Sequence, residues 1–254
     1  MKSDDSKIPA RFGRTADLYG AQGFARIRTA TVAVLGLGGV GSHAALALAR
    51  SGVGELLLVD FDQVTASSLN RSPFAGLADI GRDKVAVAAE CLARTCPDTV
   101  VTTRRDFVHE DSLPDIFAKP PDWVVDAIDS LNPKVTLLAY CVQNDLQVLS
   151  SMGAASRRDF TRVRVGDVSE TTVCPLASQV RQRLRRRGID GGFLCVYSTE
   201  KPAAALPPDL GDRTCDRGRV RNRLPSQMSL PGIFGYAVAA AVLDRLAEPD
   251  RVGH

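Results

Sequence analysis

The sequence predicts an α/β fold in which a mostly parallel sheet carries helices on both faces and is extended by a C-terminal α/β part. Two observations lead to this fold class. Apolar runs of strand length alternate with longer segments of helical periodicity, and the first two runs end in a glycine-rich turn and in an aspartate. Strand, helix and strand segments of this size form parallel, right-handed crossovers.

The regular alternation extends to residue 151. We expect strands at 31–36, 55–60, 99–104, 123–127 and 147–151, and helices at 40–51, 82–96 and 132–145. Gly52 suits the end of the first of these helices because glycine is the preferred residue there, and Pro97 stops the second.

The alternation is looser after Ser151, where strand-like segments at 162–168 and 194–199 flank a helix-like segment at 175–187. We therefore divide the chain into an N-terminal arm and helix (1–30), an α/β core (31–151) and a C-terminal part (152–254) that is continuous with the core and carries loops facing the substrate.

The strand expected at 31–36 runs directly into Gly36-Leu37-Gly38-Gly39-Val40-Gly41. Glycines allow positive φ angles and a close approach of ligand to backbone, and the N-terminus of the following helix attracts anions. Asp60 stands 19 residues after Gly41, at the end of the next strand, where a carboxylate can accept ribose hydroxyls. The core is therefore a Rossmann-like nucleotide-binding unit with Gly36, Gly38, Gly39, Gly41 and Asp60 as binding residues; a mononucleotide and a dinucleotide both remain open.

Polar residues after Asp60 favour ATP. They are Asp62, Asn70, Arg71, Lys84 and Asp129. A nicotinamide dinucleotide offers only a pyrophosphate, whereas a site that expels pyrophosphate from ATP must neutralise charge growing on the leaving group. Arg71, Lys84 and a metal ion on Asp129 can do this. Lys84 falls in the first turn of a helix, where a cation opposes the helix dipole, so a phosphate partner explains it best.

Several further segments, in this order, match one enzyme family. They are RFGRTADLYG at 11–20, DAIDS at 126–130, Lys134, AYC at 139–141, GA at 153–154, PLA at 175–177 and VYSTE at 196–200. With these residues the chain resembles the ubiquitin-activating-enzyme-like adenylating family and, within it, the tRNA threonylcarbamoyladenosine dehydratases. The similarity extends from about residue 11 to about residue 246.

The resemblance implies an ATP-dependent reaction on tRNA. The threonyl carboxylate of the modified adenosine attacks the α-phosphate, pyrophosphate leaves, and the acyl-adenylate closes to the cyclic product with release of AMP. The implied catalytic residues are Asp129 (holding Mg²⁺), Arg71 and Lys84 (on the phosphates) and Arg11. Arg11 is implied to cross a homodimer interface to the partner subunit's ATP. Sulfur-transfer or cysteine-desulfurase proteins are further expected partners.

Three alternatives stay open at this point. The first is adenylation of the C-terminal glycine of a ubiquitin-like sulfur carrier; the absence of C-x-x-C pairs, from which structural zinc sites draw ligands, counts against it. The second is a NAD-dependent oxidoreductase, which the glycine turn and Asp60 alone permit. The third is a catalytically silent interaction module, against which Lys84 and Asp129 stand.

Charge is distributed unevenly along the chain. Residues 154–188 contain nine arginines against three acidic residues, and residues 211–223 contain five arginines against two. These stretches sum to +9 in a chain of net charge +3. The imbalance favours a polyanionic partner such as tRNA, with a solvated helix face as the alternative.

The six cysteines and the N-terminus indicate a cytosolic protein. Reduced, mostly buried thiols are expected, above all Cys91, Cys141 and Cys195, whereas Cys174 and Cys215 have Arg-rich neighbours that favour reactivity. The N-terminus has no apolar segment typical of a signal peptide, and the longest C-terminal apolar tract, residues 233–243, is shorter than a bilayer requires. We expect a cytoplasmic location without a membrane span, with peripheral membrane association as an alternative.

Overall fold

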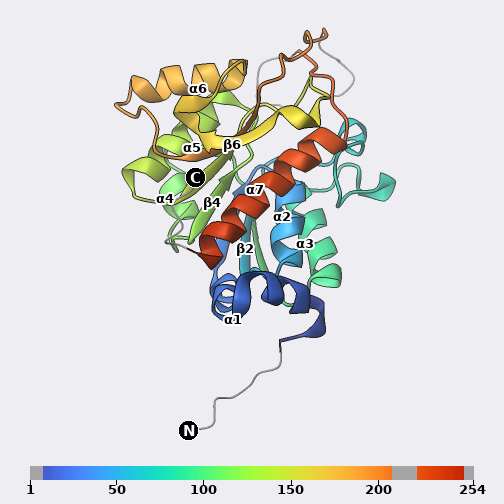
Figure 1. Cartoon of the computed structure of the whole chain (residues 1–254). Coiled ribbons are helices and arrows are strands. Elements are labelled where there is room, and N and C mark those ends of the chain that lie inside the picture. Colours follow the sequence, from blue (N-terminus) through green and yellow to red (C-terminus); the bar gives the residue numbers. More distant parts are fainter. Residues whose placement is uncertain (1–7, 208–221, 249–254) are drawn as a thin grey trace.

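A seven-stranded sheet in the order β3-β2-β1-β4-β5-β7-β6 organises the protein (Figure 1). The computed structural model describes residues 8–207 and 222–248. Its strands are β1 (Thr31–Leu35), β2 (Glu55–Val59), β3 (Val100–Arg104), β4 (Trp123–Asp126), β5 (Val148–Ser151), β6 (Val163–Asp167) and β7 (Leu194–Ser198). Its α-helices are α1 (Gly13–Thr29), α2 (Gly41–Arg50), α3 (Lys84–Thr95), α4 (Leu113–Ile116), α5 (Leu131–Gln143), α6 (Pro175–Arg185) and α7 (Ser229–Ala247).

All neighbouring strands are parallel except β6, which runs antiparallel to β7. In the centre, Val34 of β1 stands opposite Leu58 of β2 on one side and Val125 of β4 on the other. The strand order reverses between β1 and β4, because β2 and β3 extend the sheet in one direction and β5 and β7 in the other. In open α/β sheets, ligands bind outside the carboxyl ends of the strands at such a reversal.

Alternate residues of the central strands pack into two separate hydrophobic cores, one on each face of the sheet. Val32 and Val34 of β1 pack with α2, α3 and α7 on one face, whereas Ala33 and Leu35 pack with α4, α5 and α6 on the other. This follows from the two-residue period of a strand. Both faces of the sheet are covered, so β1 is apolar and buried from Val32 to Leu35. Figure 1 shows α7 lying across the front of the sheet beside α2.

The α/β fold predicted from the sequence is confirmed, and the expected strands and helices agree with the observed ones to within two residues at each end. Two features differ from the expectation. The short helix α4 was not expected, and α7 extends the apolar tract at 233–243 to 19 residues. The sheet continues past residue 151, because β5 pairs with β7, and this pairing agrees with a C-terminal part that is continuous with the core.

Helix α7 is the one helix in the described ranges that is long and apolar enough to cross a membrane. In the most apolar window of this helix 61% is buried inside the protein. Phe234, Val238 and Val242, each fully buried, belong to the core that α7 shares with α2. Helix α7 is therefore part of the protein core.

Candidate nucleotide site

Two glycines of the turn are required by the backbone itself. Gly36 has a φ of +92°, and its amide donates to the carbonyl oxygen of Val59 at 2.8 Å. A Cβ atom at Gly36 would lie 2.9 Å from the carbonyl oxygen of Ala127, and one at Gly41 would lie 1.8 Å from the carbonyl oxygen of Gly36. The turn after β1 therefore contacts both neighbouring strand ends, and only glycine fits at these two positions.

Of the other two glycines, Gly38 faces open space, whereas Gly39 packs against the side chains of Pro231 and Arg71. No atom lies within 4 Å of the position that a Cβ at Gly38 would take, so packing within the chain does not demand a glycine there. A Cβ at Gly39 would lie 3.1 Å from the Cδ atom of Arg71. Helix α2 begins at Gly41, and the Ser42 amide donates to the Gly38 carbonyl at 3.1 Å. The open side of the turn thus adjoins a helix N-terminus, which suits an anion.

Asp60 joins the turn to the end of β2. Its Oδ2 accepts the Leu37 amide at 2.5 Å, and its Oδ1 accepts the Asp62 amide at 2.8 Å. Burial raises the pKa of the Asp60 carboxyl, although the Lys84 charge and the two amides oppose this rise. Only 7% of Asp60 is exposed, so the carboxylate fixes the shape of the turn. Its predicted contact with ribose stays a prediction.

Lys84 is the first residue of α3 and reaches back toward β2. Its Nζ lies 2.8 Å from Oδ2 of Asp62 and 3.9 Å from Oδ2 of Asp60. Burial lowers the pKa of Lys84, but the attraction of Asp60 and Asp62 outweighs it and the pKa is raised. The lysine is therefore an ammonium ion at neutral pH, held beside the glycine turn.

Asn70 and Arg71 approach the turn from the segment after β2. One guanidinium nitrogen of Arg71 donates to the Ser67 carbonyl at 2.7 Å and to Oδ1 of Asn70 at 3.0 Å. The side-chain amide of Asn70 donates to the Ser226 carbonyl at 3.1 Å, so this segment contacts the chain just before α7. Gly38, Gly39, Arg71 and Lys84 line one small pocket, so the structure brings together the phosphate-binding residues predicted from the sequence.

Asp129 follows β4, on the same edge of the sheet. Its side chain is exposed, its Oδ1 accepts the Ser130 hydroxyl at 3.2 Å, and its charge helps to raise the pKa of Lys84. Within the described ranges no group of three or more His, Cys, Asp or Glu residues could hold a metal by itself. Mg²⁺ commonly binds through one or two carboxylates together with substrate phosphates and water, and Asp129 fits that arrangement.

A buried polar network behind Asp129 was not assigned a role from the sequence. The Nζ of Lys134 donates to Oδ2 of Asp126 at 2.5 Å, to the Ser150 hydroxyl at 3.2 Å and to the Ser151 carbonyl at 2.9 Å. Lys134 and Asp126 have no exposed side-chain surface, and Oδ1 of Asp126 accepts the Ile128 amide at 3.1 Å. The network joins the ends of β4 and β5 to α5 and holds the loop that carries Asp129. The sequence feature that could have indicated this network is a lysine, Lys134, within the otherwise apolar segment of α5.

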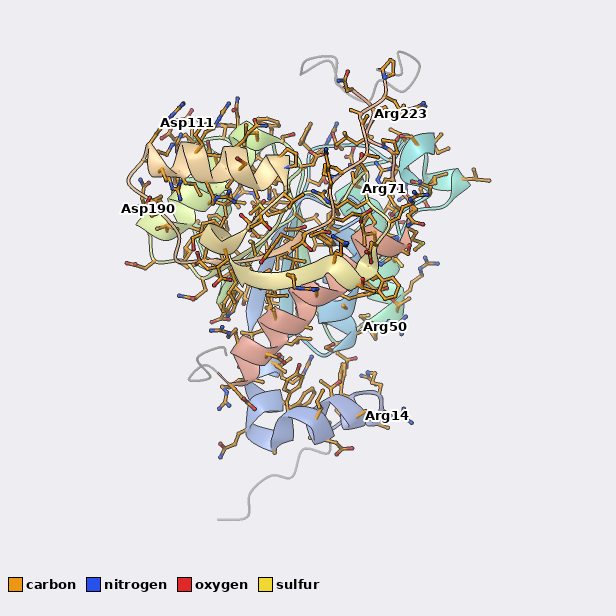
Figure 2. The ribbon with its side chains drawn as sticks, turned by 45° about the horizontal axis from the view of Figure 1, so that its top comes forward. Arg14, Arg50, Arg71, Asp111, Asp190 and Arg223 are labelled. Atoms are coloured by element: carbon orange, nitrogen blue, oxygen red, sulfur yellow. The ribbon has the colours of Figure 1, made fainter. Side chains whose placement is uncertain are left out.

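Arg11 lies away from the nucleotide site of its own chain. Its Nε donates to Oδ2 of Asp98 at 2.6 Å, and 54% of its side chain is exposed. Asp98 precedes β3, so the pair stands at the amino edge of the sheet, opposite the strand ends that carry the site. Figure 2 shows Arg14, on the same N-terminal segment, at the far end of the molecule from Arg71. Within its own chain, Arg11 therefore pairs with Asp98 and does not contribute to the nucleotide site.

The expectation of a reactive Cys174 is wrong. Only 3% of Cys174 is exposed, and it belongs to the core formed with α5 and α6. Cys141 and Cys195 are fully buried as expected, and burial raises the pKa of Cys195 to about 12. Cys91 is only partly buried, so the expectation was wrong for this residue. Cys215, and the arginines before Asn222 in the second basic stretch, lie outside the described residues.

Comparisons with known proteins agree with this geometry over nearly the whole chain. The tRNA threonylcarbamoyladenosine dehydratase of Bacillus subtilis is 36% identical over 236 residues, covering 92% of this chain and 93% of the relative. The dehydratase of Haemophilus influenzae is 38% identical, covering 93% of each. The crystal structure of the E. coli enzyme, TcdA, in complex with ATP has a TM-score of 0.83 and 33% identity, covering 96% of each chain. The model of the ThiF family matches residues 12–252, and the chain belongs to this family.

Proposed function

We propose that this protein is an ATP-dependent adenylating enzyme that converts threonylcarbamoyladenosine in tRNA to its cyclic form by dehydration. The observation that carries the proposal is the assembly of the glycine turn, Asp60, Lys84 and Asp129 at the point where the strand order reverses. Relatives that match more than nine-tenths of this chain carry the name of that activity, and one of them is solved in complex with ATP.

The chemistry requires activation because a carboxylate is a poor electrophile. Attack of the threonyl carboxylate oxygen on the α-phosphate forms an acyl-adenylate and releases pyrophosphate. A nucleophile within the same modified nucleoside then forms the ring and displaces AMP. Holding the two reacting groups of one substrate together makes this second step unimolecular, which lowers its entropic cost.

The residues of this chain supply binding and charge neutralisation. The open side of Gly38 and the N-terminus of α2 receive the phosphates, and Arg71 and Lys84 compensate the charge that develops on the leaving pyrophosphate. Asp129 holds Mg²⁺, which supplies further electrophilic stabilisation when bound. Lys134, through Asp126, fixes the loop from which Asp129 projects.

Adenylation of a sulfur carrier is the second candidate function, since the same nucleotide chemistry serves both reactions. The chain contains no C-x-x-C pair, and its basic residues gather in the C-terminal part, which favours tRNA. A nicotinamide site would not require Arg71, Lys84 and Asp129 together. Binding of ATP with magnesium should therefore be tighter than binding of NAD in calorimetry.

Mass spectrometry of tRNA nucleosides tests the proposal directly. The protein is incubated with ATP, magnesium and tRNA that carries threonylcarbamoyladenosine. We expect a nucleoside lighter by one water and an equal amount of AMP, and neither product with Asp129→Ala at the same protein concentration. AMP formed only with a sulfur-carrier protein would transfer the proposal to the second candidate. Unchanged turnover by Asp129→Ala would limit Asp129 to its hydrogen bond with Ser130, the residue that precedes α5.

We further propose a homodimer in which Arg11 completes the partner's nucleotide site. Arg11→Ala and Asp129→Ala should each be nearly inactive alone. A two-fold heterodimer of the two variants contains one site with both defects and one with neither, so mixing should restore part of the activity. No recovery, with subunit exchange confirmed by pull-down of tagged chains, would remove Arg11 from the site and leave the remaining residues in place.

The proposed setting is the cytoplasm. Sulfur-transfer or cysteine-desulfurase proteins are proposed as partners in addition to tRNA. Co-purification of tagged protein from cell extract, repeated after nuclease treatment, tests for such proteins, because a contact made only through shared RNA is lost in the treated sample.

A further inference from the structure

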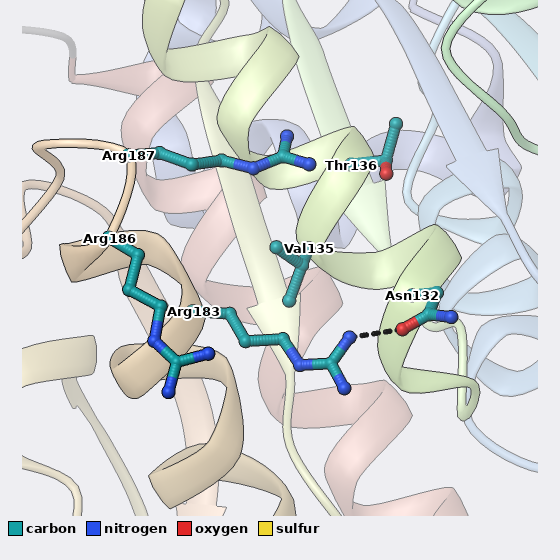
Figure 3. A pocket seen from close by; sticks show the side chains of 6 residues that line it. All are labelled: Asn132, Val135, Thr136, Arg183, Arg186 and Arg187. Atoms are coloured by element: carbon teal, nitrogen blue, oxygen red, sulfur yellow. Dashed lines mark hydrogen bonds between the residues drawn. The ribbon is translucent and has the colours of Figure 1, made fainter.

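An open pocket of about 430 Å³ lies between α5 and α6 (Figure 3). It is lined by Asn132, Val135, Thr136, Arg183, Arg186 and Arg187. The three α5 residues follow the i, i+3, i+4 spacing of one helix face, and the arginines come from the last turn of α6 and the two residues after it. Figure 3 shows the guanidinium of Arg183 reaching across to Asn132, to whose Oδ1 it donates.

The pocket is positively charged and contains no carboxylate among its lining residues. Other arginines of α6 are engaged elsewhere: Arg181 donates to the Thr171 carbonyl at 2.7 Å, and Arg185 lies 3.5 Å from Asp190. Within residues 8–207 and 222–248, no salt bridge includes Arg183, Arg186 or Arg187. Three guanidinium groups around one opening repel each other, and an anion between them removes that repulsion.

Compensation of the helix dipole explains only part of this arrangement. Basic residues at the C-terminal end of a helix are favourable, and Arg183 in the last turn of α6 and Arg186 and Arg187 directly after it meet that description in any orientation. The dipole gives no reason for Arg183 to extend across to α5, nor for a hollow at this place. Arginine has a planar fork of donors that matches phosphate oxygens, and it is preferred over lysine where such groups are bound.

The pocket adjoins the proposed reaction site. Asn132 stands three residues after Asp129, and at 3.8 Å for each residue their Cα atoms are separated by at most about 11 Å. Helix α5 begins at the carboxyl edge of the sheet, so Asn132 faces the same edge as the glycine turn. An anion in the pocket is therefore close to the reacting groups and outside the nucleotide site.

We propose that this pocket binds the phosphodiester backbone of the tRNA substrate beside the modified nucleoside, with Arg186 and Arg187 as the phosphate-binding residues and Arg183 oriented by Asn132. The inference rests on the proposed function. Phosphate contacts fix the register of a nucleic acid without reading its sequence. The pocket thus positions the RNA, and the nucleotide site carries out the chemistry.

The test compares two double variants that each remove two positive charges. Arg186→Gln/Arg187→Gln alters the pocket, whereas Arg50→Gln/Arg94→Gln alters exposed arginines in the last turns of α2 and α3, at the opposite edge. Fluorescence anisotropy measures binding of labelled tRNA over a range of salt concentrations, and calorimetry measures binding of ATP. Glutamine retains helix propensity, and thermal melting checks that both variants fold.

The pocket variant should bind tRNA about tenfold more weakly at low salt, and its log–log salt slope should be shallower by about 1.5 units than that of the parent. The control should keep the parent slope, and both should bind ATP like the parent. In turnover, the KM for tRNA should rise in the pocket variant while kcat is retained.

Equal tRNA binding by the two double variants would overturn the pocket assignment while the proposed function stands. Retained tRNA binding together with lost binding of an acidic protein partner would also overturn it, in favour of a protein interface. Failure of the parent protein itself to bind or convert tRNA would instead contradict the proposed function. Free ATP or pyrophosphate that displaces tRNA from the parent but not from the pocket variant would assign the pocket to a small phosphate ligand and reject the RNA.

Discussion

Two lysine–aspartate pairs stand at the carboxyl edge of the sheet, and they differ in how completely they are enclosed. Lys84 and Asp60 keep 16% and 6% of their side-chain surface exposed, whereas Lys134 and Asp126 keep none. The ammonium of Lys134 has three acceptors for its three N–H groups: Asp126, Ser150 and Ser151. Lys84 has one hydrogen bond in the described part of the chain, to Asp62, and it lines a pocket.

The difference separates a structural charge from a binding charge. A buried ion pair is tolerable only when every donor and acceptor is satisfied, and the Lys134 network meets this condition. It therefore holds the loop after β4 without having capacity for a ligand. Lys84 retains N–H groups for phosphate oxygens, and its carboxylate neighbours keep it charged until a ligand arrives. The role of each pair depends more on the exposure of its side chains and on whether all N–H groups of the lysine already have acceptors than on the residue types, which are the same.

Removal of Lys134 should give the largest change in stability. Lys134→Met leaves Asp126 charged and without its cation in the core, and loss of one partner of a buried pair costs about 3–5 kcal/mol. Denaturant-induced unfolding measures the free energy of unfolding. The double variant Asp126→Asn/Lys134→Met should recover part of the loss, because no unpaired charge remains. A loss of unfolding free energy below about 1 kcal/mol would be typical of an exposed ion pair. It would contradict the assignment of Lys134 as a buried structural charge.

Removal of Lys84 should affect activity more than stability. Lys84→Met should lower kcat/KM for ATP about 10²–10³-fold, the range found when one group that stabilises developing charge is removed. Its free energy of unfolding should fall by only about 1–2 kcal/mol, between the values for surface and buried pairs. Steady-state release of AMP and unfolding curves of the same preparation give both quantities. Loss of stability and activity in the same proportion would show that Lys84 also serves mainly to hold the fold.

The pH dependence of the Lys84 pair should be the smallest effect. Its pKa in the folded protein is raised above the ordinary 10.5, so the stability that its charge contributes is fully present below the unfolded pKa. That contribution is lost as the pH rises through the folded pKa. The difference in unfolding free energy between the parent and Lys84→Met should be constant near neutral pH and decline above pH 10.5. A difference that instead changes near neutral pH would assign the interaction to another titrating group.

The sequence alone determined the fold class, the strands, the helices other than α4 and the full length of α7, and the residues of the glycine turn. These features depend on local patterns: apolar periodicity, glycines that permit positive φ, and proline or glycine at helix ends. The first residues after each strand were also predictable as site candidates, because parallel strands bring their carboxyl ends to one edge. Asp60, Lys84 and Asp129 meet there as expected.

Only the tertiary structure decided which charges are enclosed and which are open. Lys134 and Lys84 both follow a strand-end aspartate, and the apolar segment around Lys134 indicates burial without naming its partners. Contacts of Lys134 with β5, from residues 16 and 17 positions away, complete its hydrogen-bond network. Cys174 shows the same limit, since it is buried although its neighbours in the sequence are polar and rich in arginine. The basic stretch after Ala154 was visible in the sequence. The pocket between α5 and α6, however, exists because two helices about 50 residues apart pack side by side on one face of the sheet. Long-range packing of this kind has no local sequence pattern from which it could be predicted.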